Sequence, residues 1–235
     1  MKKRSYAIEF IFILVFFVLP PLWARPASGE REAAYPLQTF LLAVLAALLV
    51  SATRARANDA SCIRRATAPV APRWSLVRLI PASAELLVAF GTLCCTASLV
   101  TLLAILLQRA PSPVLRAPHN ALTWLNCICG TVAEVFYEEV LYRKYLPDAA
   151  IALLVTPRAL QRPRAARLWR LLCEAGAIAL FAAGHRYLGA FAVLNAAVAG
   201  AVLRRCYLRT QSLWVPCIAH CAYNAVMLAF SFLQA

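Results

Sequence analysis

Charged residues are scarce in this sequence. Only 14% of its 235 residues are charged and 63% are hydrophobic, whereas soluble domains carry about 25% charged and roughly 45–50% apolar residues. An apolar excess of this size is more than one soluble core can bury, so it has to face lipid. The composition therefore excludes an ordinary soluble domain and predicts an integral membrane protein.

Common signatures of zinc and nucleic-acid binding are missing as well. No HExxH string occurs, which excludes the two-histidine helical motif of zinc metalloproteases. Cys127-x-Cys129 lacks CxxC spacing and a second pair, so a cysteine-ligated zinc site is not expected. The net charge of +14 comes without a basic patch interleaved with aromatic residues, so nucleic acid is not expected as a partner.

Long apolar runs dominate what is present. They stand at 6–23, 37–53, 84–107, 120–146, 171–186, 188–203 and 213–233, with a short run at 149–155. Because about 20 apolar residues cross a bilayer, these runs predict an all-α fold, a polytopic transmembrane helical bundle of about seven spans (roughly six to eight). The first run follows a basic start and the segment 24–27 is a poor cleavage site, so we expect an uncleaved anchor.

The basic residues indicate how the chain crosses the membrane. They gather in four stretches, at 2–4, 54–78, 143–170 and 204–209. The positive-inside rule places these stretches and the N-terminus in the cytoplasm, and residues 157–170 are typical of an interfacial amphipathic segment. We expect a multi-pass protein of the cell membrane, and the compact loops with a basic N-terminus favour a bacterial inner membrane.

The charges inside the apolar runs concentrate in the second half of the chain. Residues 1–119 form apolar spans without a motif, and residues 120–235 carry the candidate site. Charged groups at membrane depth are costly, so they mark function or a structural pair. Glu139 and Arg143 are four residues apart and can pair on one helix face. Glu138 points elsewhere at about 100° per residue and has no basic partner at helical spacing, which leaves it free as a general base.

Two later runs add further polar groups. Phe181 and His185 share one helix stripe with Glu174, and His220 and Asn224 share a face of the last run. A carboxylate can take a proton from water, an imidazole can orient that water, and His220 and Asn224 can each donate to a developing oxyanion. The set therefore predicts amide hydrolysis.

If each apolar run crosses the membrane once, Glu138 and His185 are expected to lie far apart. Glu138 falls near the cytoplasmic end of its helix and His185 near the outer end of the next, about 25 Å away at 1.5 Å per residue. Either residues 160–170 extend the later helix into the cytoplasm, or residues 149–155 dip into the bilayer. We favour the extension, because the arginines of 160–170 are too dense for lipid.

Three short sequence motifs, taken in their order along the chain, resemble those of a known family. They are Glu138-Glu139-x-x-x-Arg143, Phe181-x-x-x-His185 and His220-x-x-x-Asn224. Together they resemble the EExxxR, FxxxH and HxxxN/D motifs of the CPBP family, which comprises CAAX prenyl endopeptidases and bacteriocin-processing or immunity proteins. The resemblance covers about residues 120–233, and Gln211 stands where the family commonly has glycine.

The resemblance implies an intramembrane endopeptidase and assigns roles to the residues. Glu138 and His185 would activate water, and His220 and Asn224 would form the oxyanion hole. Glu139 and Arg143 would hold the helix, with Phe181 as structural support. The substrate would be a membrane-associated peptide or protein within the lipid bilayer.

Two alternatives stay open at this point. The family has been described as metal-dependent, and Glu138, His185 and His220 could form a zinc site with an open position; we predict catalysis without metal or other cofactor. The same polar residues could also form a non-catalytic membrane scaffold, or a peptide-binding or immunity protein. A Glu138→Gln variant separates these functions, because a scaffold does not need that carboxylate.

Overall fold

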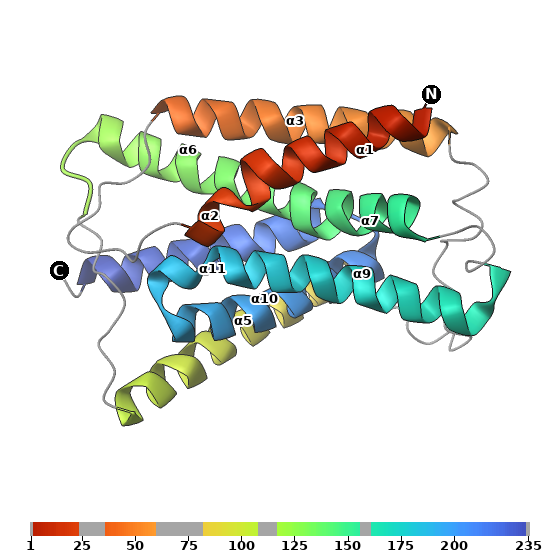
Figure 1. The fold of residues 1–235 in the computed structure, drawn as a ribbon. Helices are drawn as coiled ribbons and strands as arrows, with labels where there is room; N and C mark the ends of the chain where they lie inside the picture. Colours follow the sequence, from red (N-terminus) through yellow and green to blue (C-terminus); the bar gives the residue numbers. More distant parts are fainter. Residues whose placement is uncertain (1, 24–35, 60–81, 108–116, 156–160, 234–235) are drawn as a thin grey trace.

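The computed structural model describes residues 2–23, 36–59, 82–107, 117–155 and 161–233. The elements are α1 (Lys2–Ile13), η1 (Leu14–Val18), α2 (Pro20–Trp23), α3 (Pro36–Asp59), α5 (Ala82–Leu106), α6 (Ala121–Glu138), η3 (Glu139–Tyr145), α7 (Leu146–Leu154), α9 (Pro163–Gly184), η4 (Arg186–Leu188), α10 (Ala190–Thr210) and α11 (Trp214–Leu233). All are helical and the described residues contain no strand, which confirms the all-α fold. Figure 1 shows the long helices running along one direction, with the two termini at opposite ends.

Four helical segments of the described residues are long and apolar enough to cross a membrane. They are Tyr6–Trp23, α5, α10 and α11, and a shorter apolar helix covers Phe40–Ser51. The helices α6 and α9 carry glutamates or arginines among their apolar residues. The chain is therefore a polytopic helical membrane protein, and the count of about seven spans stays a prediction.

The helix that carries Glu138 is longer than the sequence indicated. Elements α6, η3 and α7 follow one another without a gap over 18, 7 and 9 residues. Within them the N–H of Leu146 donates to the carbonyl of Leu141, five residues earlier, which is the wide turn of a π-helix. The short apolar run at 149–155 thus falls mostly within α7, which continues the same helix. Glu138 lies near the middle of this helix and not near its end.

The arginine-rich stretch before His185 is helical, as the preferred of the two topologies required. Helix α9 begins at Pro163, with Arg162 at its N-cap, and Arg164 and Arg167 are exposed. The arginines of 204–209, which follow the apolar run 188–203, are helical as well. They lie in the last turns of α10, which ends only at Thr210.

Two apolar clusters hold the helices together. The first joins α1, η1, α3, η3 and α9 through residues such as Val18, Leu49 and Leu141. The second joins α5, α10 and α11 through Leu93, Leu203 and Ala219. Helices of residues 1–119 thus pack directly on those of 120–235, while the division of the chain into these two parts stays a prediction.

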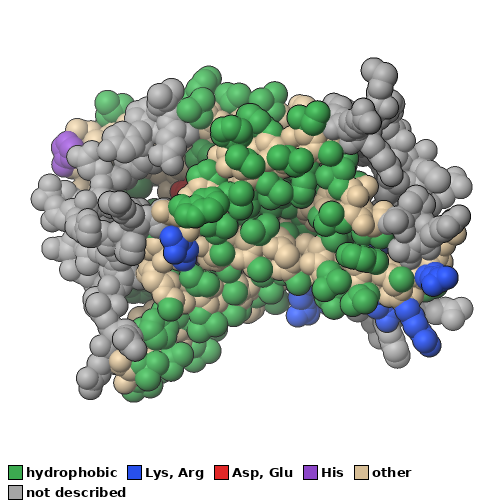
Figure 2. Space-filling model, in the orientation of Figure 1, with side chains coloured by type: hydrophobic (Ala, Val, Ile, Leu, Met, Phe, Trp, Pro, Cys, Tyr) green, Lys and Arg blue, Asp and Glu red, His purple; other side chains and the backbone are tan. Residues whose placement is uncertain are grey.

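The surface agrees with a membrane location. The face shown in Figure 2 is mostly apolar, and its Lys and Arg side chains gather mainly toward the end where α9 begins. The N-terminus lies at that same end in Figure 1, as the positive-inside prediction requires. The basic stretch 60–78 and the segment 24–27 lie outside the described residues.

Candidate active site

His220 of α11 lies against the two adjacent glutamates of the long helix. Its Nδ1 is 3.0 Å from Glu139 Oε1, and its Nε2 is 3.9 Å from Glu138 Oε2. His220 is 6% exposed and Glu139 is completely buried. Although successive residues of an α-helix point about 100° apart, both carboxylates reach this ring, because each meets a different ring nitrogen. A gap of 3.9 Å also leaves both groups within reach of one shared water.

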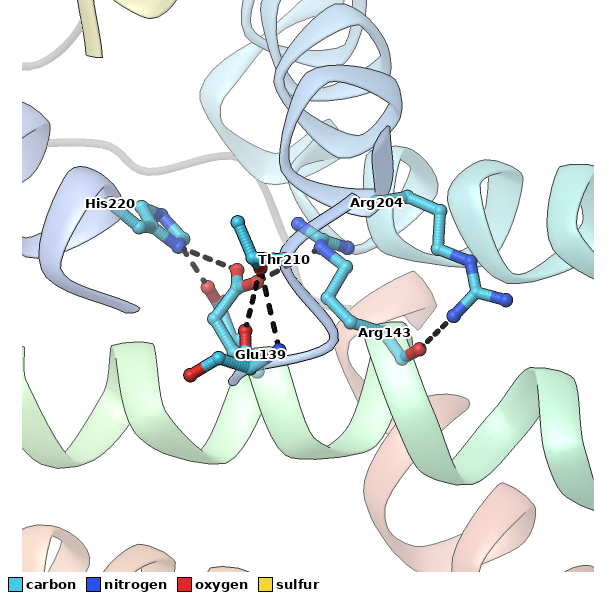
Figure 3. Close-up of polar contacts among 7 residues, drawn as sticks. Glu139, Arg143, Arg204, Thr210 and His220 are labelled. Carbon is cyan, nitrogen blue, oxygen red and sulfur yellow. Dashed lines mark hydrogen bonds and ion pairs between the residues drawn. The ribbon is translucent and has the colours of Figure 1, made fainter. Parts of the chain in front are cut away.

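Glu139 forms the predicted pair with Arg143. Arg143 Nε lies 3.2 Å from Glu139 Oε2, and both side chains are completely buried. The two terminal nitrogens of Arg143 have no hydrogen-bond partner among the described residues. Its guanidinium also lies over the Phe181 ring, 4.4 Å from the centroid, a favourable position for a cation on an aromatic face. Figure 3 shows Arg143 and His220 converging on Glu139 from opposite sides.

Phe181 is the apolar centre of the site. Its ring contacts the ring of His185 at 4.8 Å and that of His220 at 6.4 Å between centroids, both edge to face. Phe181 is 2% exposed, so it closes the space between the two imidazoles. The FxxxH string thus supplies a ring that both histidines and Arg143 pack on.

His185 is held by the backbone of its own helix. Its Nδ1 is 2.9 Å from the carbonyl oxygen of Phe181, four residues earlier. Because a carbonyl only accepts, Nδ1 carries the hydrogen, and in the neutral ring Nε2 is then an acceptor. No contact between His185 and Glu138 is found in the described part of the chain. The structure brings His185 to the site through Phe181 instead.

Asn224 follows His220 by four residues on α11, so the two side chains share a helix face. Asn224 is half-buried, and its amide has no hydrogen-bond partner among the residues that the structure describes. An unused donor beside His220 is what an oxyanion role requires, and the role itself stays a prediction.

Two residues near the site were not identified as part of it from the sequence. Glu134 lies one turn before Glu138, and its carboxylate interacts electrostatically with both His185 and His220. The i, i+4 spacing to Glu138 could have indicated this. Arg204 was counted only as a topology signal, yet it is 7% exposed and donates to the backbone carbonyl of Arg143. No local sequence pattern predicts that contact.

The possible zinc ligands Glu138, His185 and His220 lie around this site. The described residues contain no group of three His, Cys, Asp or Glu side chains placed to hold one metal ion. Glu138 and His220 are close, and among the described residues the ring of His185 contacts that of Phe181. Catalysis without metal stays a prediction.

The comparisons with known proteins bear on the second half of the chain. Neither the curated proteins nor the solved structures give a match. Residues 120–226 match a family model described as type II CAAX prenyl endopeptidase Rce1-like. This segment contains all seven residues of the three motifs, and it confirms the resemblance that they indicated. Residues 120–226 are therefore similar to the Rce1-like type II CAAX prenyl endopeptidases, which are a family of proteases.

Proposed function

We propose that this protein is an intramembrane endopeptidase that hydrolyses a peptide bond by water activated at Glu138 and His185. The observation that supports this most is the position of His220, with Nδ1 at Glu139 and Nε2 3.9 Å from Glu138. This contact joins a carboxylate and an imidazole from two different helices, within a membrane protein that is similar to a protease family.

Glu138 is the proposed base. Its carboxylate has no hydrogen-bond partner among the described residues and no basic residue at helical spacing, unlike Glu139, which is held by Arg143. Glu138 takes a proton from water as the water oxygen bonds to the substrate carbonyl carbon, and the same proton passes to the leaving amine as the C–N bond breaks. The acceptor Nε2 of His185 supports this step by orienting the water.

His220 and Asn224 are the proposed oxyanion donors. Because Glu139 accepts from His220 Nδ1, Nε2 is the ring atom left to face the substrate, and it donates in the imidazolium form. The Asn224 amide supplies a second donor from the same helix face. Each such donor typically lowers the barrier by about 2.7–4 kcal/mol.

The proposed reaction uses no metal, since a carboxylate base and two donors account for each step. A chelator tests this directly. Turnover of the purified protein should be the same with and without EDTA, and loss of turnover that zinc restores would contradict the metal-free mechanism.

The substrate proposed is a peptide or protein that is associated with the membrane. The protein has helices that can span a bilayer, and the charged site residues are buried within the bundle, so a substrate has to reach them from the membrane or its surface. Maturation of a peptide, immunity or envelope processing in a bacterial inner membrane fits this location.

The experiment is cleavage of a membrane-embedded peptide library by the purified protein in liposomes. Glu138→Gln should lower kcat by about 10²–10⁴, the usual contribution of a general base, with an unchanged melting temperature. Glu85→Gln is the matched control, because Glu85 is a buried carboxylate that pairs with Arg209 outside the site. It should keep its turnover. If wild type cleaves nothing and Glu138→Gln retains the cellular function, the protein is the non-catalytic scaffold instead.

A further inference from the structure

Arg204 of α10 ties three helices together behind the site. It is 7% exposed. Its Nη1 donates to the backbone carbonyl of Arg143 in η3, and its Nη2 lies 2.8 Å from Glu174 Oε1 on α9. Figure 3 shows the Arg204 guanidinium directed at the backbone of the long helix, while the Arg143 side chain turns toward Glu139.

The carbonyl that Arg204 binds lacks the donor that an α-helix would give it. In an α-helix the carbonyl of Arg143 accepts from the N–H of the residue four positions later. That residue is Pro147, in the first turn of α7, and proline has no N–H. A buried carbonyl left without a donor is unfavourable. Arg204 therefore supplies from another helix the hydrogen bond that Pro147 cannot make.

The same segment sets the direction of the two glutamates. Element η3 begins at Glu139, and the bond from Leu146 to Leu141 gives it the wide π-helical turn. Such turns are often found at functional sites. Here the turn begins between Glu138 and Glu139, which reach the two ring nitrogens of His220. A donor that holds the far end of η3 thereby acts on the placement of both carboxylates.

We propose that Arg204 is a positioning residue for catalysis, which holds the junction of η3 and α7 by donating to the Arg143 carbonyl in place of Pro147. The inference rests on the peptidase function proposed above. Glu174 has the secondary part of holding the Arg204 side chain in place, with 2.8 Å between the charged groups.

The test compares two variants that affect different contacts of the same side chain. Arg204→Met removes the donor to the carbonyl and the ion pair, whereas Glu174→Gln removes only the ion pair. In the liposome assay, Arg204→Met should lower kcat about tenfold or more with KM nearly unchanged, as expected when one buried hydrogen bond is lost. Glu174→Gln should keep kcat within about twofold. Equal losses of kcat in the two variants would overturn the proposal.

Adding Pro147→Ala to Arg204→Met is the specific rescue. Alanine restores an N–H four residues after Arg143, so the carbonyl regains a donor from its own helix. The kcat of the double variant should be at least about threefold higher than that of Arg204→Met, which is expected to lose roughly tenfold relative to wild type. Absence of any recovery would show that the carbonyl is not what Arg204 acts on. If Arg204→Met does not fold, Arg204→Leu, which also lacks a donor, replaces it, and an unchanged kcat in that variant would contradict the proposal.

Amide hydrogen exchange tests the same idea without turnover. The amides of residues 139–146 and of Asp148 should exchange about tenfold or more faster in Arg204→Met than in wild type, and those of Glu174→Gln should not. If wild type cleaves no peptide, the proposed function fails while the exchange result still decides whether Arg204 holds η3. Unchanged exchange in Arg204→Met would refute the inference even in an active peptidase.

Discussion

Glu139 and Glu138 are adjacent, yet the structure predicts that substituting them has different consequences. Glu139 is completely buried, pairs with Arg143 Nε at 3.2 Å and accepts from His220 Nδ1 at 3.0 Å. Among the described residues, the ion-pair contact of Glu138 is the 3.9 Å approach to His220. Glu139→Gln should therefore lower the stability of the fold, while Glu138→Gln should lower kcat alone.

The magnitude follows from the burial of the pair. Glutamine at 139 has nearly the same shape and can still bond His220, but it leaves the Arg143 charge without its counterion in a completely buried position. Removing one partner of a buried ion pair costs about 3–5 kcal/mol. For a chain of this length each kcal/mol shifts the melting temperature by about 2–4 °C, so we expect Glu139→Gln to melt about 6–20 °C lower than wild type.

The assay is thermal unfolding in detergent, with kcat measured on the same preparations. The double variant Glu139→Gln/Arg143→Met removes both charges. Its melting temperature should be well above the value obtained by adding the decreases of the two single variants. A Glu139→Gln protein that melts with wild type and loses kcat as Glu138→Gln does would refute the assignment. The two glutamates would then share one catalytic role.

Three further changes separate packing, backbone and catalysis. A Cβ at Gly200 would lie 3.2 Å from Phe181 Cδ1, so Gly200→Ala should lower kcat by displacing that ring. Its effect on the melting temperature should be small, because the cost of overpacking (about 1–3 kcal/mol) is opposed by a gain in helix propensity of about 1 kcal/mol. Gln211 has a φ of 54° and donates to the Leu208 carbonyl, so the β-branched Gln211→Val should cost about 1–2 kcal/mol in denaturant unfolding with kcat unchanged. Asn224→Ala should lower kcat about 10²–10³-fold at an unchanged melting temperature.

The contacts of the site between residues of the same helix could be predicted from the sequence. The spacing of Glu139 and Arg143 predicts their ion pair, and that pair is present at 3.2 Å. The apolar runs predicted the helices because the lipid environment leaves the backbone few other ways to satisfy its hydrogen bonds. From Pro163 on, the predicted extension before His185 is helical, and its arginines are too polar for a span.

The contacts that depend on a local change of helix geometry, or on the packing of two helices, could not be predicted from the sequence. The rule of 100° per residue assumes an unbroken α-helix, and it indicated that Glu138 and Glu139 face different partners. The π-turn of η3 and the two nitrogens of His220 bring both to one ring. Periodicity also carries no information on contacts between helices, so the bond from Arg204 to a carbonyl 61 positions away was missed.

The two ring nitrogens of His220 have different partners: Nδ1 meets the structural Glu139, and Nε2 faces the proposed base Glu138. Glu139 is held by Arg143, and its bond to Nδ1 fixes the plane of the imidazole. A ring fixed at one nitrogen has its other nitrogen fixed in direction, so Nε2 points toward Glu138 without any contact that Glu138 itself has to provide. The carboxylate that is free to accept a proton can therefore change its charge state during a reaction without releasing the histidine. This separation requires two adjacent glutamates, because a single carboxylate that both held the ring and took the proton would lose its hold on Nδ1 at each turnover.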